Sequence, residues 1–313
     1  MNSSIRNIII STLFTFVMVF NCYAQDSSDV SLDNKEFIPK IPLSLMSKIP
    51  SQQIDPLKTD IDYTLLAGVG GLTLGVGIGV QIYQANAWWQ DQGSTFKFEN
   101  DWEYALWLDK LGHFYGTALI AHGLSAGFEA SNVDLEMSAI YGAIGAFTFE
   151  TFVEIQDGYG PNWGFSPGDL GADFLGALYT VGQYYYPTLK HIQPRASYYP
   201  SKEYRNGEHE GNIIDDYAGQ KYWLAFRMKE LLPKTISEYW PSFLMLSVGM
   251  GLRDWDGSGG GKRDIFIALD FDAETLPLHG PIWQFVKNTL NFIHFPMPGI
   301  RISPDAAAFV FVY

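Results

Sequence analysis

The chain has 313 residues, which is enough for one large domain or two smaller ones. Charged residues make up 17% of the chain, below the roughly 25% that is usual in soluble domains, and aromatic residues reach 16%. These fractions favour a membrane-associated protein or one with a very large core. The net charge of -14 opposes binding to a phosphate backbone, so we expect no nucleic-acid partner.

Residues 1–24 have the pattern of a secretory signal peptide. Arg6 provides the basic start, residues 8–20 are apolar, and small residues precede a cleavage site after Ala24. We therefore expect an exported, membrane-associated protein, at the outer membrane or in the periplasm. Cys22 is the single cysteine and lies inside this segment, so the mature protein would have no thiol or disulfide. The alternatives are an uncleaved anchor and a lipid attached to Cys22.

Composition divides the rest of the chain into four parts. Residues 25–58 are polar and contain prolines, as is typical of a tether. Residues 59–189 form the predicted helical domain, and residues 190–220 are predicted to be a linker because prolines and glycines interrupt them. Residues 221–313 are predicted to be a mixed α/β region. The expected fold class is mainly α: a Gly-rich, membrane-associated four-helix bundle followed by a small region that contains a β-hairpin.

Within these parts, apolar periodicity and capping signals locate the individual elements. Helices are expected over 63–83, 103–128, 134–155 and 166–185, and a shorter helix over 281–293. Strands are expected over 242–252 and 264–272, joined as a hairpin, and over 306–313. An outer-membrane barrel needs at least about eight strands, and too few are predicted here.

Three of the predicted helices carry pairs of ionisable residues one turn apart. The pairs are Asp109 and His113, Glu150 and Glu154, and Asp169 and Asp173. Residues four apart share one face of a helix. Because charged groups in apolar surroundings need partners, we expect the three faces to meet in one polar centre.

This polar centre supplies the candidate functional residues. We expect His113, Glu154 and Asp173 to be catalytic, because an imidazole and carboxylates can exchange protons. The same chemistry suits a divalent metal ion, the one cofactor that we can suggest. Its candidate ligands are Asp109, His113, Glu150, Glu154, Asp169 and Asp173. Structural roles are expected for Lys110, Asp157 and Ser166.

Simpler interpretations stay open for several of these residues. Asp109 with His113 or Lys110 could form a self-contained buried pair. Glu150 could lie at a solvated helix end. Asp169 could belong to a capping box that begins with Ser166 at the N-cap and has Pro167 at the first helical position.

Three short segments resemble the YfiM-like family of predicted envelope proteins, whose function is unknown. They are residues 107–113 (WLDKLGH), 154–158 (EIQDG) and 163–169 (WGFSPGD), in that order, and residues 222–224 and 268–270 are similar to parts of longer members. The resemblance extends over roughly residues 60–310 and implies a place in the cell envelope.

The chain also resembles the VanZ-like membrane proteins, which are linked to tolerance of glycopeptide antibiotics without a settled reaction. The matching residues, on successive helices, are Asp109, Lys110, His113, Glu154 and Asp169. Two positions differ: Asp157 stands where those proteins usually have Gln, and Asp173 where they usually have Asn.

Three functions are compatible with these observations. The first is an envelope protein that binds a membrane lipid or another envelope component at the polar centre. The second is a hydrolase that uses the same residues with a metal ion or by acid and base catalysis. The third is a scaffold for outer-membrane assembly with envelope protein partners, in which the polar centre only holds the helices together.

Overall fold

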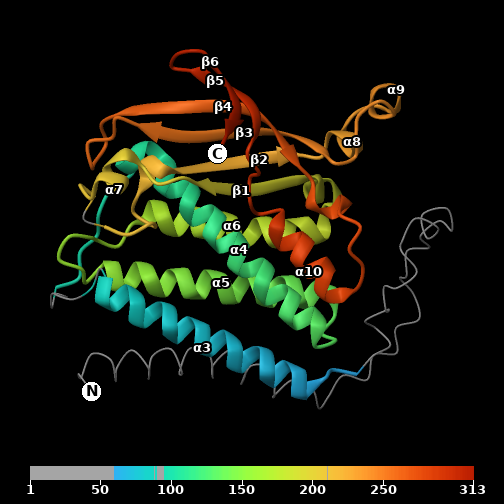
Figure 1. Ribbon diagram of the computed structural model, residues 1–313. Helices are drawn as coiled ribbons and strands as arrows, with labels where there is room; N and C mark the ends of the chain where they lie inside the picture. Colours follow the sequence, from blue (N-terminus) through green and yellow to red (C-terminus); the bar gives the residue numbers. More distant parts are fainter. Residues whose placement is uncertain (1–59, 88, 90–94, 210) are drawn as a thin grey trace.

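The computed structural model describes residues 60–87, 89, 95–209 and 211–313, and Figure 1 shows two layers, helices below and a sheet above. The predicted signal peptide (1–24), with Cys22, and the polar leader (25–58) lie outside the described residues. The longer helices are α3 (Tyr63–Ala87), α4 (Leu108–Ala130), α5 (Leu135–Asp157), α6 (Pro167–Tyr185) and α10 (Pro281–Leu290). The strands are β1 (Ile192–Tyr198), β2 (Gln220–Phe226), β3 (Leu244–Arg253), β4 (Lys262–Phe271), β5 (Met297–Ser303) and β6 (Ala307–Val312).

The short helical segments lie in the connections. They are the 3-10 turns η2 (Tyr104–Trp107), η3 (Pro187–His191), η4 (Tyr217–Gly219) and η5 (Ala273–Thr275), and the one-turn helices α7 (Lys202–Asn206), α8 (Met228–Leu231) and α9 (Lys234–Ser237). The turn η2 leads directly into α4 and therefore fixes where the polar residues of α4 begin.

The predicted fold class is wrong, because the C-terminal part is a large sheet and the protein is not a mainly α four-helix bundle. Six strands form one antiparallel sheet in the order β1-β2-β3-β4-β5-β6. The expected hairpin of β3 and β4 is present, with Val248 opposite Ile267. Strands β1, β2 and β5 were not predicted, and they extend the hairpin on both sides.

Strand β1 lies within residues 190–220, where the sequence predicts a linker. Its Pro194 pairs with Leu224 of β2, and β1 is the first strand in the sheet order. Proline lacks a backbone N–H and is tolerated in edge strands, so it does not interrupt this sheet. On the other side of β1, Ala196 exchanges hydrogen bonds with Phe292 and His294.

Helix α4 lies in the middle of the molecule, in contact with α5, α6 and the sheet (Figure 1). Glycines permit its close packing against the other two helices. A Cβ atom at Gly142 of α5 would lie 2.8 Å from the carbonyl oxygen of Ala121, and one at Gly176 of α6 would lie 2.4 Å from that of Phe114. Small residues at such contacts allow helix backbones to approach, which brings the polar faces of α4, α5 and α6 together.

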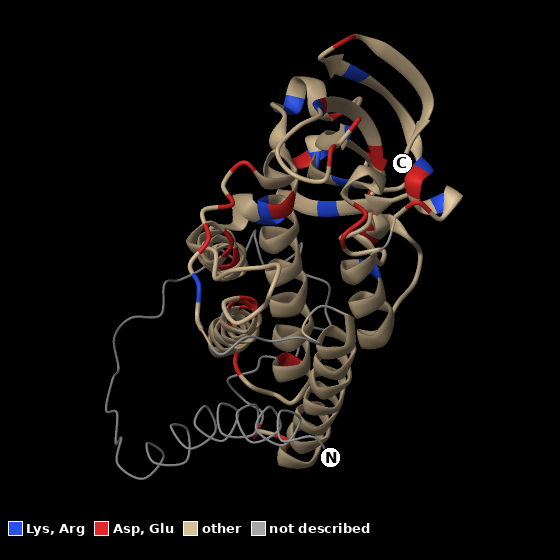
Figure 2. Ribbon diagram, turned by 90° about the vertical axis from the view of Figure 1, so that its left-hand side faces the viewer, with Lys and Arg blue, Asp and Glu red and all other residues tan. Residues whose placement is uncertain are grey.

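Helix α3 covers the outer side of the helical layer. It begins beside the end of α4, where Val69 contacts Gly127, and Trp89, just beyond its end, reaches Asp157 of α5. Within the described residues, α3 is the one helix long and apolar enough to cross a membrane by length and composition. In Figure 2, charged residues are sparse over the lower, helical part of the molecule and more frequent around the sheet.

Candidate functional site

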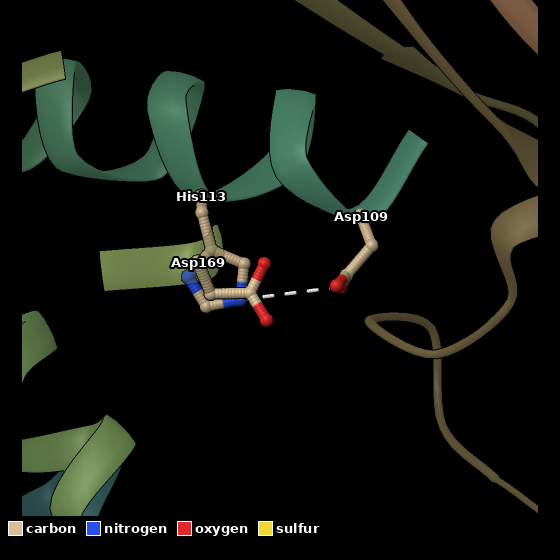
Figure 3. Close-up of side chains that lie close together, drawn as sticks. All are labelled: Asp109, His113 and Asp169. Carbon is tan, nitrogen blue, oxygen red and sulfur yellow. Dashed lines mark ion pairs between the residues drawn. The ribbon is translucent and has the colours of Figure 1, made fainter. Parts of the chain in front are cut away.

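Helix α4 begins at an unusual turn and carries the first pair of site residues. The backbone of Ala105, Leu106 and Trp107 is left-handed, with φ values of 45°, 52° and 78°. Trp107 is the N-cap and provides no side-chain cap. The carboxylate of Asp109 in the first turn suits the positive end of the helix dipole. One turn later His113 points in the same direction, and Figure 3 shows its ring beside Asp109 and Asp169.

Lys110 lies among three carboxylates. Its ammonium nitrogen is 2.8 Å from Asp101, 2.9 Å from Asp109 and 2.9 Å from Asp169. The lysine and the last two carboxylates are buried. Lys110 therefore links the start of α4, the start of α6 and the chain before η2. Removing the lysine would leave uncompensated buried charge.

His113 is placed between two pairs of carboxylates. Its Nδ1 lies 3.2 Å from Asp173 and 3.9 Å from Glu154, while its Nε2 lies 3.9 Å from both Asp109 and Asp169. Of these four contacts, the one with Asp173 is a hydrogen bond. The structure thus brings one imidazole into contact with acidic residues from α4, α5 and α6, as the helix faces predict.

The predicted capping box at the start of α6 involves both Asp169 and Glu154. Ser166 is the N-cap of α6, and its hydroxyl accepts the N–H of Asp169 at 3.1 Å. The N–H of Ser166 itself donates to Glu154 on α5 at 3.0 Å. In a capping box the residue in the place of Asp169 accepts that bond. Here Glu154 accepts it, and the Asp169 carboxylate is therefore available to Lys110 and His113.

Glu150 and Asp157, the remaining predicted carboxylates, lie beside this group. The carboxylate of Glu150 faces Gly116 of α4, at 3.9 Å from where a Cβ atom would be. Asp157 accepts a hydrogen bond from the indole of Trp89 at 2.6 Å. Glu150 therefore belongs to the polar interior, and Asp157 joins α5 to the segment that follows α3.

The pKa values of Glu150, Glu154, Asp169 and His113 are all raised, but the physical cause differs between the acids and the imidazole. Burial raises the pKa of Glu154 to about 9, although the charge of His113 opposes the shift. Burial likewise raises the pKa values of Asp169 and Glu150. Burial alone would lower the pKa of His113, but the hydrogen bond to Asp173 and the neighbouring carboxylates raise it well above its usual value. The centre therefore favours bound positive charge.

The site contains two overlapping groups with the geometry of metal ligands. They are Asp109, His113 and Asp169, and His113, Glu154 and Asp173; in each, one candidate ligand atom per residue lies within 4.8 Å of the others. The Asp169 oxygen that faces His113 also lies 2.9 Å from the Lys110 ammonium, so the first group is already partly compensated. Imidazole and carboxylate ligands suit zinc and manganese.

Three residues of the site were not predicted. Thr117 donates a 2.8 Å hydrogen bond to Asp173, Asp101 contacts Lys110, and the hydroxyl of Tyr217 donates to Asp109 at 2.5 Å. Thr117 is one turn beyond His113, so its helical spacing could have identified it. Asp101 and Tyr217 lie outside the helices, where the sequence offers no periodicity that connects them with the centre.

Comparison with known proteins shows that the same segment is similar to an envelope family. Residues 97–185 match the model of a family described as "Predicted periplasmic lipoprotein (DUF2279)". This range includes all the candidate site residues on α4, α5 and α6 and also Asp101. No curated protein and no solved structure matches the chain. The narrower resemblances to YfiM-like and VanZ-like proteins stay predictions. The protein is exported, membrane-associated and located in the cell envelope, and it is similar to a family of periplasmic proteins whose function is unknown.

Proposed function

We propose that this envelope protein binds a divalent metal ion at the polar centre and, through that ion, an anionic envelope component. The observation that carries the proposal is the position of His113 between four carboxylates within 3.9 Å. An imidazole and several carboxylates at this spacing are a familiar ligand set for a divalent metal.

The balance of charge supports a cation. Five acidic side chains contact Lys110 or His113: Asp101, Asp109, Glu154, Asp169 and Asp173. In the described part of the chain, these two basic residues are the cations in contact with that group. Even with His113 protonated, acidic groups outnumber basic ones. Buried carboxylates in excess must take up protons or bind a cation, and a divalent ion satisfies several of them at once.

The two halves of the centre are not equivalent. Lys110 already compensates Asp109 and Asp169, so a second cation there would meet its repulsion. The other half has Glu154 and Asp173 around Nδ1 of His113, with Glu150 nearby. We therefore assign the metal to His113, Glu154 and Asp173. Asp109 and Asp169 would orient the imidazole through Nε2, as outer carboxylates do in metal sites.

The charge of the centre also restricts the envelope ligand. A phosphate or carboxylate headgroup would be repelled by the carboxylates and would need the metal as a bridge. Charged residues are scarce over the helical layer in Figure 2, and an apolar layer of this kind suits contact with lipid tails. A membrane lipid with an anionic headgroup is accordingly the ligand class that we propose.

Metal content of the purified full-length protein in detergent tests this proposal. After incubation with zinc or manganese and removal of free ion, we expect about one ion per chain in the wild type. We expect no bound ion in Glu154→Gln and Asp173→Asn, which keep the size of each side chain. The control is Asp272→Asn, a buried aspartate that contacts Arg227 and Asn291. A wild-type metal content no higher than background, or the same metal content in the wild type and all variants, would contradict the proposal.

A second candidate function, hydrolysis by acid and base catalysis, is favoured by the pairing of His113 with Asp173. Nδ1 of the imidazole contacts Asp173, whose carboxylate is itself fixed by Thr117. Nε2 has no contact closer than 3.9 Å to the neighbouring carboxylates. An aspartate that orients a histidine and leaves the other nitrogen available is the arrangement of a general base.

Variants of His113 separate these functions from the scaffold alternative. Under the catalytic hypothesis, His113→Gln abolishes a cellular phenotype although the protein accumulates normally. Under the metal-binding hypothesis, the same variant also loses the ion. If His113→Gln and Glu154→Gln only fail to accumulate in the envelope, the centre holds the helices together and the scaffold function is favoured.

A further inference from the structure

The left-handed turn Ala105–Trp107 is the most unusual backbone segment among the described residues. Each of its three residues has a positive φ although none is glycine. Residues with a Cβ atom rarely adopt this conformation, and it persists where surrounding contacts impose it. Residues of the polar centre flank this turn on both sides: Asp101 lies four residues before the turn, and Asp109 lies two residues after it.

The hairpin formed by β3 and β4 holds this turn. The N–H of Ala105 donates to the carbonyl oxygen of Ser258 at 2.8 Å. Arg263 donates from Nε to the carbonyl oxygen of Leu106 at 3.0 Å, and its guanidinium lies 5.4 Å from the centre of the Trp107 ring. The sheet thus fixes three consecutive residues immediately before α4.

A second connection runs from η4 to the first turn of α4. The hydroxyl of Tyr217 donates to Asp109, and the Tyr217 ring packs against Tyr104 and Trp255 at centroid distances of 5.6 and 5.3 Å. Leu252 of β3 packs in the same cluster with Ala105 and Leu108. The direction of the Asp109 carboxylate is therefore set by the sheet layer as well as by α4.

We infer that Arg263 and Tyr217 are positioning residues of the polar centre: together they fix the start of α4 so that Asp109 and Lys110 face His113 and Asp169. Asp109 and Lys110 lie in the first turn of α4, which has no side-chain cap, and helix ends without such contacts fray. If the turn before α4 relaxes, this first turn can unwind and Lys110 loses its contact with Asp169 of α6. The metal ion of the proposed function enters only one of the two measurements that test these roles.

The first readout is the affinity of the detergent-purified full-length protein for Co²⁺, followed by its visible absorption. We expect Tyr217→Phe and Arg263→Met to weaken binding by about tenfold or more, the scale for loss of groups that orient metal ligands. The matched controls are Tyr104→Phe, in the same aromatic cluster, and Arg253→Met, in the same hairpin but paired with Asp264 and Asp305. We expect both controls to bind Co²⁺ like the wild type.

The second readout needs no metal. The imidazole ¹⁵N signals of His113, assigned with His113→Gln, are compared in metal-free proteins at one pH. We expect them to move in Tyr217→Phe and Arg263→Met and to stay in place in the controls. Unchanged signals in the first two variants, or equal changes in all four, would overturn the positioning roles. If the wild type binds no Co²⁺ but the signals move as expected, the positioning roles stand and the proposed metal site fails.

Discussion

Glu154 of α5 accepts the backbone N–H of Ser166 at 3.0 Å, so a carboxylate of one helix caps the start of the next. Both residues are buried, and the bond places α6 so that Asp169 and Asp173 face α4. One carboxylate thus has two tasks, because its other oxygen lies 3.9 Å from His113. The two tasks respond differently to substitution.

Glu154→Gln and Glu154→Ala should separate these tasks. Glutamine retains a carbonyl oxygen for the Ser166 N–H, whereas alanine leaves that buried N–H without an acceptor, at a cost of about 1–3 kcal/mol. We expect chemical denaturation to show a clearly lower free energy of unfolding for Glu154→Ala than for Glu154→Gln. Both variants should lose the metal ion. Equal stability of the two variants would show that the cap contributes little.

Two glycines of α6 provide a test of how closely α6 must approach α4. A Cβ atom at Gly176 would lie 2.4 Å from the carbonyl oxygen of Phe114, whereas one at Gly171 would meet no atom within 4 Å. Gly176→Ala should lower the free energy of unfolding by about 1–3 kcal/mol, as overpacking does. It should also weaken metal binding, because α6 carries Asp173 away from His113.

Gly171→Ala is the matched control in the same helix. Alanine loses less backbone freedom than glycine on folding and stabilises a helix by roughly 0.5–1 kcal/mol. Thermal unfolding and metal affinity measured on both variants check the pair. A Gly176→Ala variant as stable as Gly171→Ala would show that the two helices can separate without loss.

Helix periodicity predicted the polar centre well, because spacing along a helix determines which side chains share a face. His113, Glu154 and Asp173 come together for that reason. Spacing cannot identify partners contributed by irregular segments. Asp101 and Tyr217 reach the centre only because the turn η2 and the segment before β2 fold back against α4.

The sheet was underestimated for a different reason. Strand β1 contains Pro194 and was predicted as a linker, and β5 (MPGIRIS) contains both Pro298 and Gly299. These residues oppose strand formation in isolation, so local composition points to loops. In β1, the pairing with β2 and the contacts of the buried Arg195 compensate for the low strand propensity of proline. Arg195 is bonded to Asp270 at 2.8 Å and to Asn291 at 2.9 Å. Such long-range partners leave no local pattern.

Lys110 should be essential for stability at neutral pH. Lys110→Met removes the cation shared by Asp101, Asp109 and Asp169 and leaves their charges buried together. Loss of one partner of a buried ion pair costs about 3–5 kcal/mol. We expect a loss of this size at pH 7 in chemical denaturation. The control is Lys262→Met, whose exposed partner is Asp254; its loss should stay below about 1 kcal/mol.

His122 should make the protein less stable in mild acid. Burial lowers the pKa of its imidazole to about 4, and the ring is packed against Phe285 and Phe292 of the α10 region. Between pH 6.5 and 4 the unfolded chain binds a proton that the folded protein excludes. The contribution of His122 to stability is therefore complete above pH 6.5 and is lost as the pH falls toward 4, by on the order of 2–3 kcal/mol.

His122→Gln isolates this contribution, because glutamine does not titrate and can still bond to Thr289, the partner of His122. We expect the free energy of unfolding of the variant, relative to the wild type, to rise steadily as the pH is lowered from 7 to 4.5. Other groups titrate equally in both proteins, so the difference between the two curves reports His122 alone. Parallel curves over this range would mean that the ring is protonated in the folded protein and that its packing against α10 tolerates the charge.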